Sequence, residues 1–299
     1  MYPNPQDVLP LPPADEVRAW VASLTQARAT DTVRAWADAH APRVADALVH
    51  WMARAYPDGG ADRSVAEAVV SRIFGFADWA TLERHLMAAP ESDARRFERA
   101  ADAIVTGDLA ALTVLLREEP ALIHARSDRV HGATLLHYVA ANGVENYRQR
   151  TPANIVAIAT ALLDAGADVN AACDVYGGGA TTLGLTVTSA HPRAAGVQEA
   201  LAQRLLDRGA TIDERVVHAC LMNGCPEAAV FMAGERLARG GALRLDEAAG
   251  IGRVDLVTAA LRTLPTSSPL ITAAREIASW YDQHAVLALL DATAPSEGA

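Results

Sequence analysis

The chain has 299 residues, a formal net charge of −10, and few aromatic residues at 5% of the total. An acidic balance disfavours a general affinity for nucleic acid or for an anionic membrane. No segment approaches the ~20 consecutive apolar residues that a membrane span needs. We therefore expect neither nucleic acid nor membrane as a partner, and closely packed, alanine-rich helices rather than sheets.

The cysteines and the N-terminal residues indicate in which cellular compartment the protein is located. Cys173, Cys220 and Cys225 are an odd number without zinc or redox spacing, which predicts reduced thiols in the core. The first residues have neither a basic start nor an apolar run, so we expect no signal peptide. The predicted location is cytoplasmic.

The N-terminal third predicts a lead and a helical bundle. Residues 1–13 contain five prolines, which predicts an extended, polyproline-like segment lying along a neighbouring surface. Residues 14–92 then predict a bundle of five helices, the first three at 15–29, 31–40 and 42–56. A capping box formed by Ser64 and Glu67 would open the fourth. Asp78 or Thr81 would cap the fifth, which ends near Leu86.

Residues 132–170 contain two amphipathic segments separated by a turn. Thr134 is placed to cap the first helix, and Asn142-Gly143 ends it because glycine tolerates a left-handed backbone. Thr151-Pro152 would start the second helix. Its apolar stripe has helical spacing: Ile155, Ile158, Ala159, Leu162 and Leu163. Two such short helices cannot bury their apolar faces alone, so copies must stack.

This stretch resembles the ankyrin repeat, which starts T-P-L-H-x-A and finishes G-A-D-V-N. The start is matched by Thr134, Leu136, His137 and Ala140, with Leu135 in place of the proline, and the finish by Leu162, Leu163, Asp164, Gly166, Ala167, Asp168, Val169 and Asn170. The resemblance implies an all-α solenoid that binds a protein partner through its concave face and fingers. Residues 74–86 also resemble a segment that precedes ankyrin repeats in bacterial proteins.

Six helix pairs can be placed within residues 93–294 by the position that breaks each pair, followed by a tail at 295–299 that is disordered by composition. The breaks are Gly107, Gly143, Ala190, Gly224, Gly252 and Tyr281. Pair one is predicted at 95–106 and 108–117, and pair three at 182–189 and 197–207. A capping box of Thr211 and Glu214 would open pair four. We also expect the helix at 95–106 to present Ala100, Ala103 and Ile104 toward the bundle, which would cap the solenoid.

Pairs two and three contain insertions that the other pairs lack. Pair two has extra residues at 144–150, pair three has a polar loop at 191–196, and the finger before pair three is lengthened at 174–179. Insertions at equivalent points of adjacent repeats lie side by side on one edge. The polar residues of the first insertion are expected to be exposed to solvent, namely Glu145, Tyr147, Arg148 and Arg150.

A conflict between residue type and predicted fold points to a binding site. Gly184 lies inside a helix at the place that His137 holds in pair two, although glycine costs roughly 1 kcal/mol there relative to alanine. Its missing side chain would leave a notch beside Tyr138, covered by the insertion as a lid. The alternative is that Gly184 only permits tighter helix packing. The candidate binding residues are His137, Tyr138, Asn142, Tyr147, Arg148, Tyr176 and Gly184.

The sequence contains no recognised catalytic motif. His124, His131 and His137 lack metal-ligand spacing, and Gly177-Gly178-Gly179 has neither the preceding strand nor the lysine of a phosphate loop. We therefore expect no metal and no cofactor, read His137 and His218 as scaffold residues, and favour a non-enzyme. Two alternatives stay open. One is a small-molecule-binding protein or enzyme with a pocket around His137, Tyr138, Tyr147 and Tyr176; the other is a structural dimer through the bundle.

Overall fold

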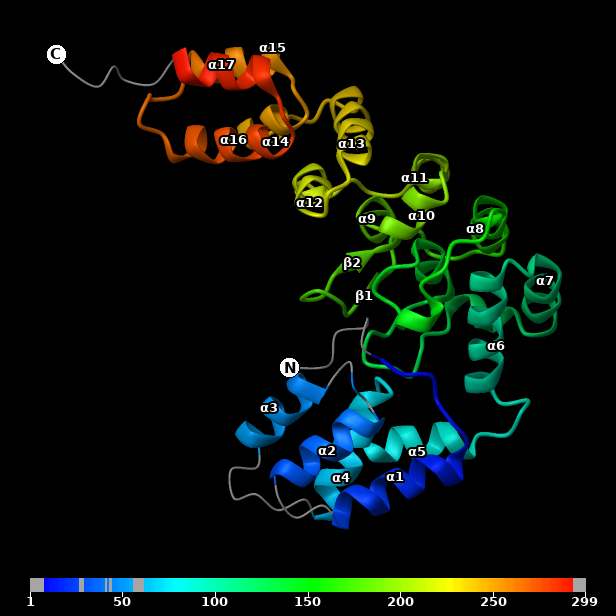
Figure 1. The fold of residues 1–299 in the computed structure, drawn as a ribbon. Helices are drawn as coiled ribbons and strands as arrows, with labels where there is room; N and C mark the ends of the chain where they lie inside the picture. The colour runs from blue at the N-terminus through cyan, green and yellow to red at the C-terminus, as the bar shows by residue number, and fades with distance from the viewer. Residues whose placement is uncertain (1–7, 27–29, 41, 43–44, 56–61, 293–299) are drawn as a thin grey trace.

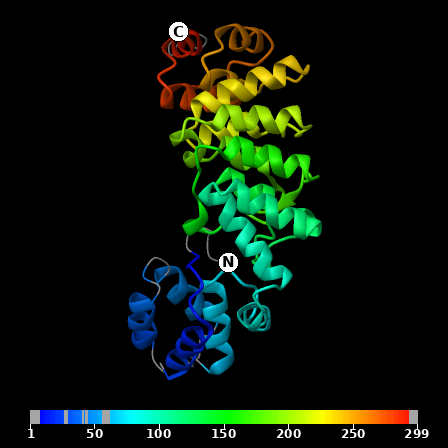
Figure 2. The same ribbon diagram turned by 90° about the vertical axis from the view of Figure 1, so that its right-hand side faces the viewer.

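The computed structural model describes residues 8–26, 30–40, 42, 45–55 and 62–292. Within these ranges the chain is mostly helical, and its one sheet has two short antiparallel strands, so the all-α class is confirmed. Figures 1 and 2 show a group of N-terminal helices at one end of an elongated stack of helix pairs, with the C-terminus at the opposite end. No helix in the described part of the chain is long and apolar enough to span a membrane.

The N-terminal bundle contains α1 (Ala14–Gln26), α2 (Thr30–His40), α3 (Ala45–Ala55), α4 (Arg63–Ile73) and α5 (Trp79–Met87). Its core is apolar and aromatic, with Val17, Leu24, Val69, Phe74, Phe76 and Leu82 completely buried. Asp78 caps α5 by accepting the Thr81 N–H at 2.8 Å, as expected. The prediction that Ser64 and Glu67 form a capping box at the start of α4 was wrong, because Asp62 is the N-cap of that helix. The Asp62 carboxylate accepts the Val65 N–H at 3.0 Å and also the Ser64 hydroxyl.

Part of the proline-rich lead lies along the bundle. Residues 8–13 are not helical, the Val8 side chain is buried, and the Leu9 N–H donates to the Ile73 carbonyl at 3.1 Å. Residues 1–7 lie outside the described residues, as do parts of the predicted helices at 15–29 and 42–56 and the tail at 295–299. The described part of the lead therefore packs against a neighbouring surface, as its composition suggested.

Six helix pairs follow in the described part of the chain, and each pair breaks near the predicted position. They are α6 (Asp93–Thr106) with α7 (Leu109–Glu118), the 3-10 helix η3 (Leu135–Ala140) with α8 (Ile155–Asp164), α9 (Thr182–Val187) with α11 (Gln198–Asp207), α12 (Val216–Met222) with α13 (Pro226–Ala238), α14 (Leu245–Gly250) with α15 (Val254–Leu261), and α16 (Pro269–Trp280) with α17 (His284–Ala292). Short connecting elements are η2 (Pro120–His124), η4 (Asn146–Arg148), α10 (Ala190–Ala194), β1 (Ala172–Cys173) and β2 (Ala180–Thr181).

Successive pairs pack through equivalent helices. The first helices contact one another in the order α6, η3, α9, α12, α14 and α16, and the second helices α7, α8, α11 and α13 do the same. A continuous apolar core runs from Phe97 to Ala233 through pairs one to four and also includes Ile277 of α16, and a smaller core joins pairs five and six. Each pair thus buries its apolar face against the next.

Two predicted helix starts were wrong because their residues bind the preceding pair instead. Pro152 and Asn154 pack on the turn at Gly107, where the Asn154 side-chain amide donates to the Gly107 carbonyl at 2.8 Å, so α8 begins at Ile155 rather than at Thr151-Pro152. The Thr211 N–H likewise donates to the Asn170 side chain at 2.8 Å. Consequently α12 begins at Val216, without the box of Thr211 and Glu214.

The expected contact between α6 and the bundle was also wrong. Ala100, Ala103 and Ile104 are buried in the core of the stack, where α6 packs against α7 and η3. These small and branched residues fill the inside of the first pair, because its two helices must cover each other. The loop residues 128–130 contact the bundle instead, at His85, Phe74 and Gly75.

Candidate functional site

The long finger of pair three is a β-hairpin. Its strands β1 and β2 pair with Ala172 opposite Thr181, and its tip contains Tyr176 with a φ of 52° followed by three glycines of positive φ. The Asp174 N–H donates to the His131 carbonyl at 2.8 Å, and Arg126 Nη1 donates to the Ala172 carbonyl at the same distance. The hairpin is therefore held against the loop that enters pair two.

A groove of about 920 Å³ opens to solvent beside this hairpin. It is lined by the hairpin, by the ends of η3 and α9, and by the start of pair four, including Asn142, Gln149, Gly184, His191, Asp213 and His218. Tyr176 and Met222 also line it, and their side chains are 59% and 51% exposed. Gln149 from the first insertion and His191 from the second border the same groove, which agrees with the expectation that the insertions are neighbours.

Three of the predicted binding residues meet on this groove. The Tyr176 hydroxyl donates to Asn142 Oδ1 at 2.8 Å, and Asn142 Nδ2 donates to the Leu185 carbonyl at 3.2 Å. A Cβ built on Gly184 would meet just one non-neighbouring atom within 4 Å among the described residues, Thr181 Oγ1 at 3.6 Å. The alternative that Gly184 permits tighter helix packing was therefore wrong, because space remains where its side chain would lie.

His137 is a support beneath the hairpin rather than a groove residue. Its side chain is completely buried, and its Nδ1 accepts the Thr134 N–H at 3.1 Å. Burial lowers the pKa of His137 to about 4, against the opposing effect of the Ala180 and Ala171 backbone. Ala171 precedes β1 and Ala180 lies in β2, so the neutral imidazole lies near the base of the hairpin, but its Nε2 has no hydrogen-bond partner among the described residues.

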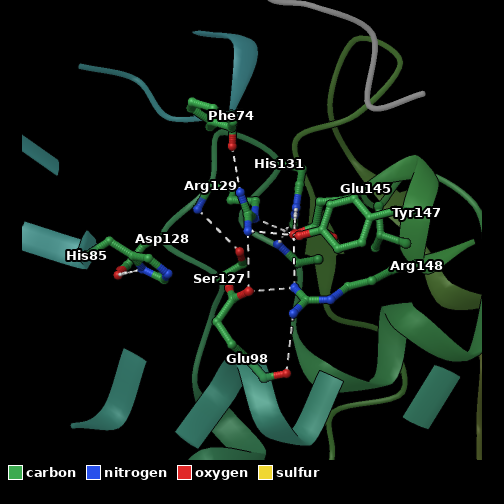
Figure 3. Close-up of polar contacts among 12 residues, drawn as sticks. Phe74, His85, Glu98, Ser127, Asp128, Arg129, His131, Glu145, Tyr147 and Arg148 are labelled. Carbon is green, nitrogen blue, oxygen red and sulfur yellow. Dashed lines mark hydrogen bonds and ion pairs between the residues drawn. The ribbon is translucent and has the colours of Figure 1, made fainter. Parts of the chain in front are cut away.

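The remaining predicted residues belong to a second feature, the buried charge cluster, which consists of Glu98, Arg129, Glu145 and Arg148 (Figure 3). Arg148 Nη1 lies 2.6 Å from Glu98 Oε2 and 3.3 Å from Glu145 Oε1. Arg129 pairs with both carboxylates. Its Nη2 lies 3.3 Å from Glu98 Oε2, and its Nε forms an ion pair with Glu145 Oε1. Two guanidinium groups and two carboxylates thus neutralise one another in a largely buried position, where Glu98 alone keeps an exposure above 10%.

Charge pairing keeps both acids ionised. Burial by itself would raise the pKa of Glu98 and of Glu145, but Arg129 and Arg148 outweigh it and hold both pKa values below their ordinary range. Tyrosines complete the cluster: the Tyr138 hydroxyl donates to Glu145 at 3.3 Å, and Arg129 donates to the Tyr147 hydroxyl at 3.1 Å. Burial raises the pKa of Tyr147 to about 12 and that of Tyr138 well above its usual value.

The predicted exposure of the first insertion was wrong for Glu145 and Arg148, and the predicted lid was wrong with it. Glu145 and Arg148 are buried and Tyr147 is half-buried, whereas Arg150 is exposed. The insertion turns toward α6, because the positively charged Arg148 pairs with Glu98 and Asp102 on that helix. Tyr138 is completely buried and does not face the groove. Of the four residues in the predicted small-molecule pocket, the described groove includes Tyr176 alone.

Sequence reasoning missed Glu98 and Arg129. One signal was present, because Glu98 and Asp102 are four residues apart on α6 and therefore lie on the same side of the helix. Arg148 contacts both, with its Nε 2.8 Å from Asp102 Oδ1. Arg129 lies in an irregular loop, where no periodicity marks a buried position.

Arg129 also joins the stack to the N-terminal bundle. Its Nη1 donates to the Phe74 carbonyl at 2.5 Å, and its guanidinium lies 5.0 Å from the centre of the Phe76 ring. The neighbouring Val130 N–H donates to the Gly75 carbonyl at 2.9 Å. The buried charge cluster is therefore a structural junction between the turn after α4 and the first two helix pairs.

His218 differs from His137 although both were read as scaffold residues. Its Nδ1 lies 2.9 Å from Asp246 Oδ2, so it does connect α12 to α14. Its side chain is nevertheless 32% exposed and lines the groove. Arg244 holds the same carboxylate through two hydrogen bonds of 3.0 Å.

The three cysteines are free and buried, as their number and spacing predicted. Burial raises the pKa of the Cys173 thiol to about 12 and also raises the pKa of Cys220 and Cys225, which makes them poor nucleophiles at neutral pH. Across the described ranges, no group of three or more His, Cys, Asp or Glu side chains is arranged to hold a metal ion.

In comparisons with known proteins, no family model matches this chain and no curated protein matches it. The groove, the hairpin beside it and the buried charge cluster are therefore the observations from which a function can be argued.

Proposed function

We propose that residues 93–292 form an ankyrin-like binding module that recognises a protein partner through the groove and the hairpin. The observation that carries this proposal is the open groove of about 920 Å³ with Tyr176 and Met222 exposed on it. An elongated surface made by successive repeats suits an extended partner, and its open side admits a chain that continues beyond it.

The exposed side chains have the chemistry of an interface. Aromatic residues and methionine are enriched at protein–protein interfaces. A tyrosine such as Tyr176 buries a large, rigid area for little loss of conformational freedom, and a methionine such as Met222 adapts its shape to the partner. Polar groups beside them, such as Asn142 and His218, can fix the orientation of a partner through hydrogen bonds. The groove thus combines apolar anchors with hydrogen-bonding groups.

The hydrogen bonds that hold the hairpin favour a preformed site. The Tyr176 hydroxyl donates to Asn142 Oδ1 at 2.8 Å, and the Asp174 N–H and the Arg126 guanidinium hold the hairpin against the loop that enters pair two. A surface that is already ordered loses less conformational entropy on binding, which leaves more of the contact energy as affinity.

Photo-crosslinking tests the proposal. A photoreactive phenylalanine analogue would replace Tyr176 or Met222 in the full chain, and in matched controls it would replace Val114 of α7 or Val230 of α13. Those control residues are exposed apolar residues outside the groove. We expect both groove positions to crosslink to one and the same protein and the control positions not to. Equal labelling at all four positions would refute a groove-specific partner.

Calorimetry with the purified partner then measures the contribution of each anchor. Tyr176→Ala and Met222→Ala should each weaken binding by about 1–2 kcal/mol, the range expected when an interface anchor is truncated. Val114→Ala is the control and should leave the affinity unchanged.

A further inference from the structure

The imidazole of His218 is oriented by the buried Asp246 of the next helix pair, and the neighbouring Glu247 contacts the His218 backbone. Its ring Nδ1 lies 2.9 Å from Asp246 Oδ2, and its backbone N–H donates to Glu247 Oε1 at 3.3 Å. Both acidic side chains are buried, and Arg244 and Arg236 pair with them. The ring therefore has little freedom to rotate, although part of it is exposed to the groove.

This contact decides which ring nitrogen carries the proton in neutral His218. An ionised carboxylate can only accept hydrogen bonds, so the nitrogen that contacts Asp246 must be the protonated one. Nδ1 is then the donor, and Nε2 keeps a lone pair. No hydrogen bond to Nε2 is found within the described residues. His218 therefore offers the groove an unused acceptor.

Met222 lies beside this acceptor. His218 and Met222 are four residues apart on α12, so they lie on the same side of that helix. Both line the groove, and Met222 is 51% exposed. One face of α12 thus presents an acceptor next to an apolar surface. A matching peptide would carry a donor next to an apolar side chain.

We infer that His218 is a specificity-determining residue of the groove, which selects a partner segment carrying a hydroxyl or amide hydrogen-bond donor beside an apolar residue. This inference rests on the proposed function and adds the chemistry of the partner. Asp246 acts as a positioning residue, because it fixes the tautomer of His218 without facing the partner. A buried acceptor left without a donor loses affinity, which is the physical source of the selection.

The tautomer can be measured on the free full-length chain. A long-range 1H–15N spectrum, which distinguishes the two neutral tautomers, should show the proton of His218 on Nδ1. The signals are assigned by their absence in His218→Phe, and His124→Phe is the control because His124 is exposed and lies outside the groove. A proton on Nε2 would overturn the inference.

Peptide selection tests the partner chemistry. A random peptide library displayed on phage would be selected against the full chain, and the selected peptides should share a Ser, Thr, Asn or Gln next to an apolar residue. Replacing that donor in the peptide, by Ser→Ala or Thr→Val, should weaken binding to the wild type by about tenfold. The same peptide change should alter binding to His218→Phe by less than about twofold. Enrichment of carboxylates instead of donors would overturn the inference.

The two proposals fail in different ways. If the selected peptides bind Tyr176→Ala and Met222→Ala with the same affinity as the wild type, the groove is not the binding surface. Peptides that depend on those anchors, but lose the same affinity on donor removal in the wild type and in His218→Phe, would overturn the role of His218 alone. Circular dichroism of His218→Phe and of a second variant, His218→Gln, verifies that the comparison is made between folded proteins.

Discussion

Arg148 Nη1 lies 2.6 Å from Glu98 Oε2, and this contact fastens the insertion of pair two to helix α6. The Arg148 side chain is 4% exposed, so its charge has been removed from water and is stabilised by acidic partners instead. An element that reads as a solvated loop in the sequence is thereby part of the interior.

The first prediction concerns this buried charge. Arg148→Met keeps most of the volume but leaves Glu98 and Glu145 with a single guanidinium between them, so it should lower the free energy of unfolding by about 3–5 kcal/mol. Urea denaturation measures the change. Arg150→Met is the matched control, since Arg150 is exposed in the same loop, and it should stay within about 0.5 kcal/mol of the wild type. Equal midpoints for the two variants would show that the cluster is energetically neutral.

A second prediction follows from the pKa of His137, which is lowered from 6.5 to about 4 by burial. Because the unfolded chain binds the proton more readily, the stabilisation from neutral His137 is fully present above about pH 6.5 and is lost as the pH falls toward 4. This residue should account for a loss of about 2 kcal/mol between about pH 7 and pH 5.

Urea titrations of the wild type and of His137→Gln at the two pH values test this assignment. The variant should be less stable at neutral pH, since it loses a buried hydrogen bond, but its stability should depend less on pH. An identical pH dependence in both proteins would show that another group titrates.

The third prediction uses the open space at Gly184. Gly184→Ala should raise stability by about 0.5–1 kcal/mol, because alanine restricts the unfolded chain and its Cβ meets just Thr181 Oγ1 among the described residues. Gly184→Leu should also fold, but its side chain would narrow the groove and weaken binding of the crosslinked partner. Full affinity in a folded Gly184→Leu protein would remove Gly184 from the binding surface.

Gly250 provides the opposite case and the fourth prediction. A Cβ there would lie 2.5 Å from Ile277 Cγ2 and 2.7 Å from Leu221 Cδ1, at the crossing of α14 with its neighbours. Gly250→Ala should therefore cost about 1–3 kcal/mol through overpacking, although alanine favours helix formation. Thermal unfolding of the wild type and of Gly250→Ala measures whether the substitution lowers or raises the stability. A gain in stability would mean that α14 and α16 can separate at little cost.

Local spacing in the sequence determined the helices and most of their breaks. The apolar stripe from Ile155 to Leu163, the cap at Asp78 and the stop at Gly107 each depend on a few neighbouring residues, and such signals are readable without a structure. The free, buried state of the three cysteines followed in the same way from their number and spacing.

Tertiary structure decided where the polar residues lie. Arg148 is charged and belongs to an insertion, so its sequence context predicts exposure. Its acidic partners Glu98 and Asp102 lie 50 and 46 residues earlier in the chain and contact it only in the folded state. His137 and His218 occupy equivalent places in their pairs, but one is buried under the hairpin and the other borders the groove. The physical reason is that burying a charge or an imidazole depends on partners brought together by packing, and their distance along the chain carries no local signal.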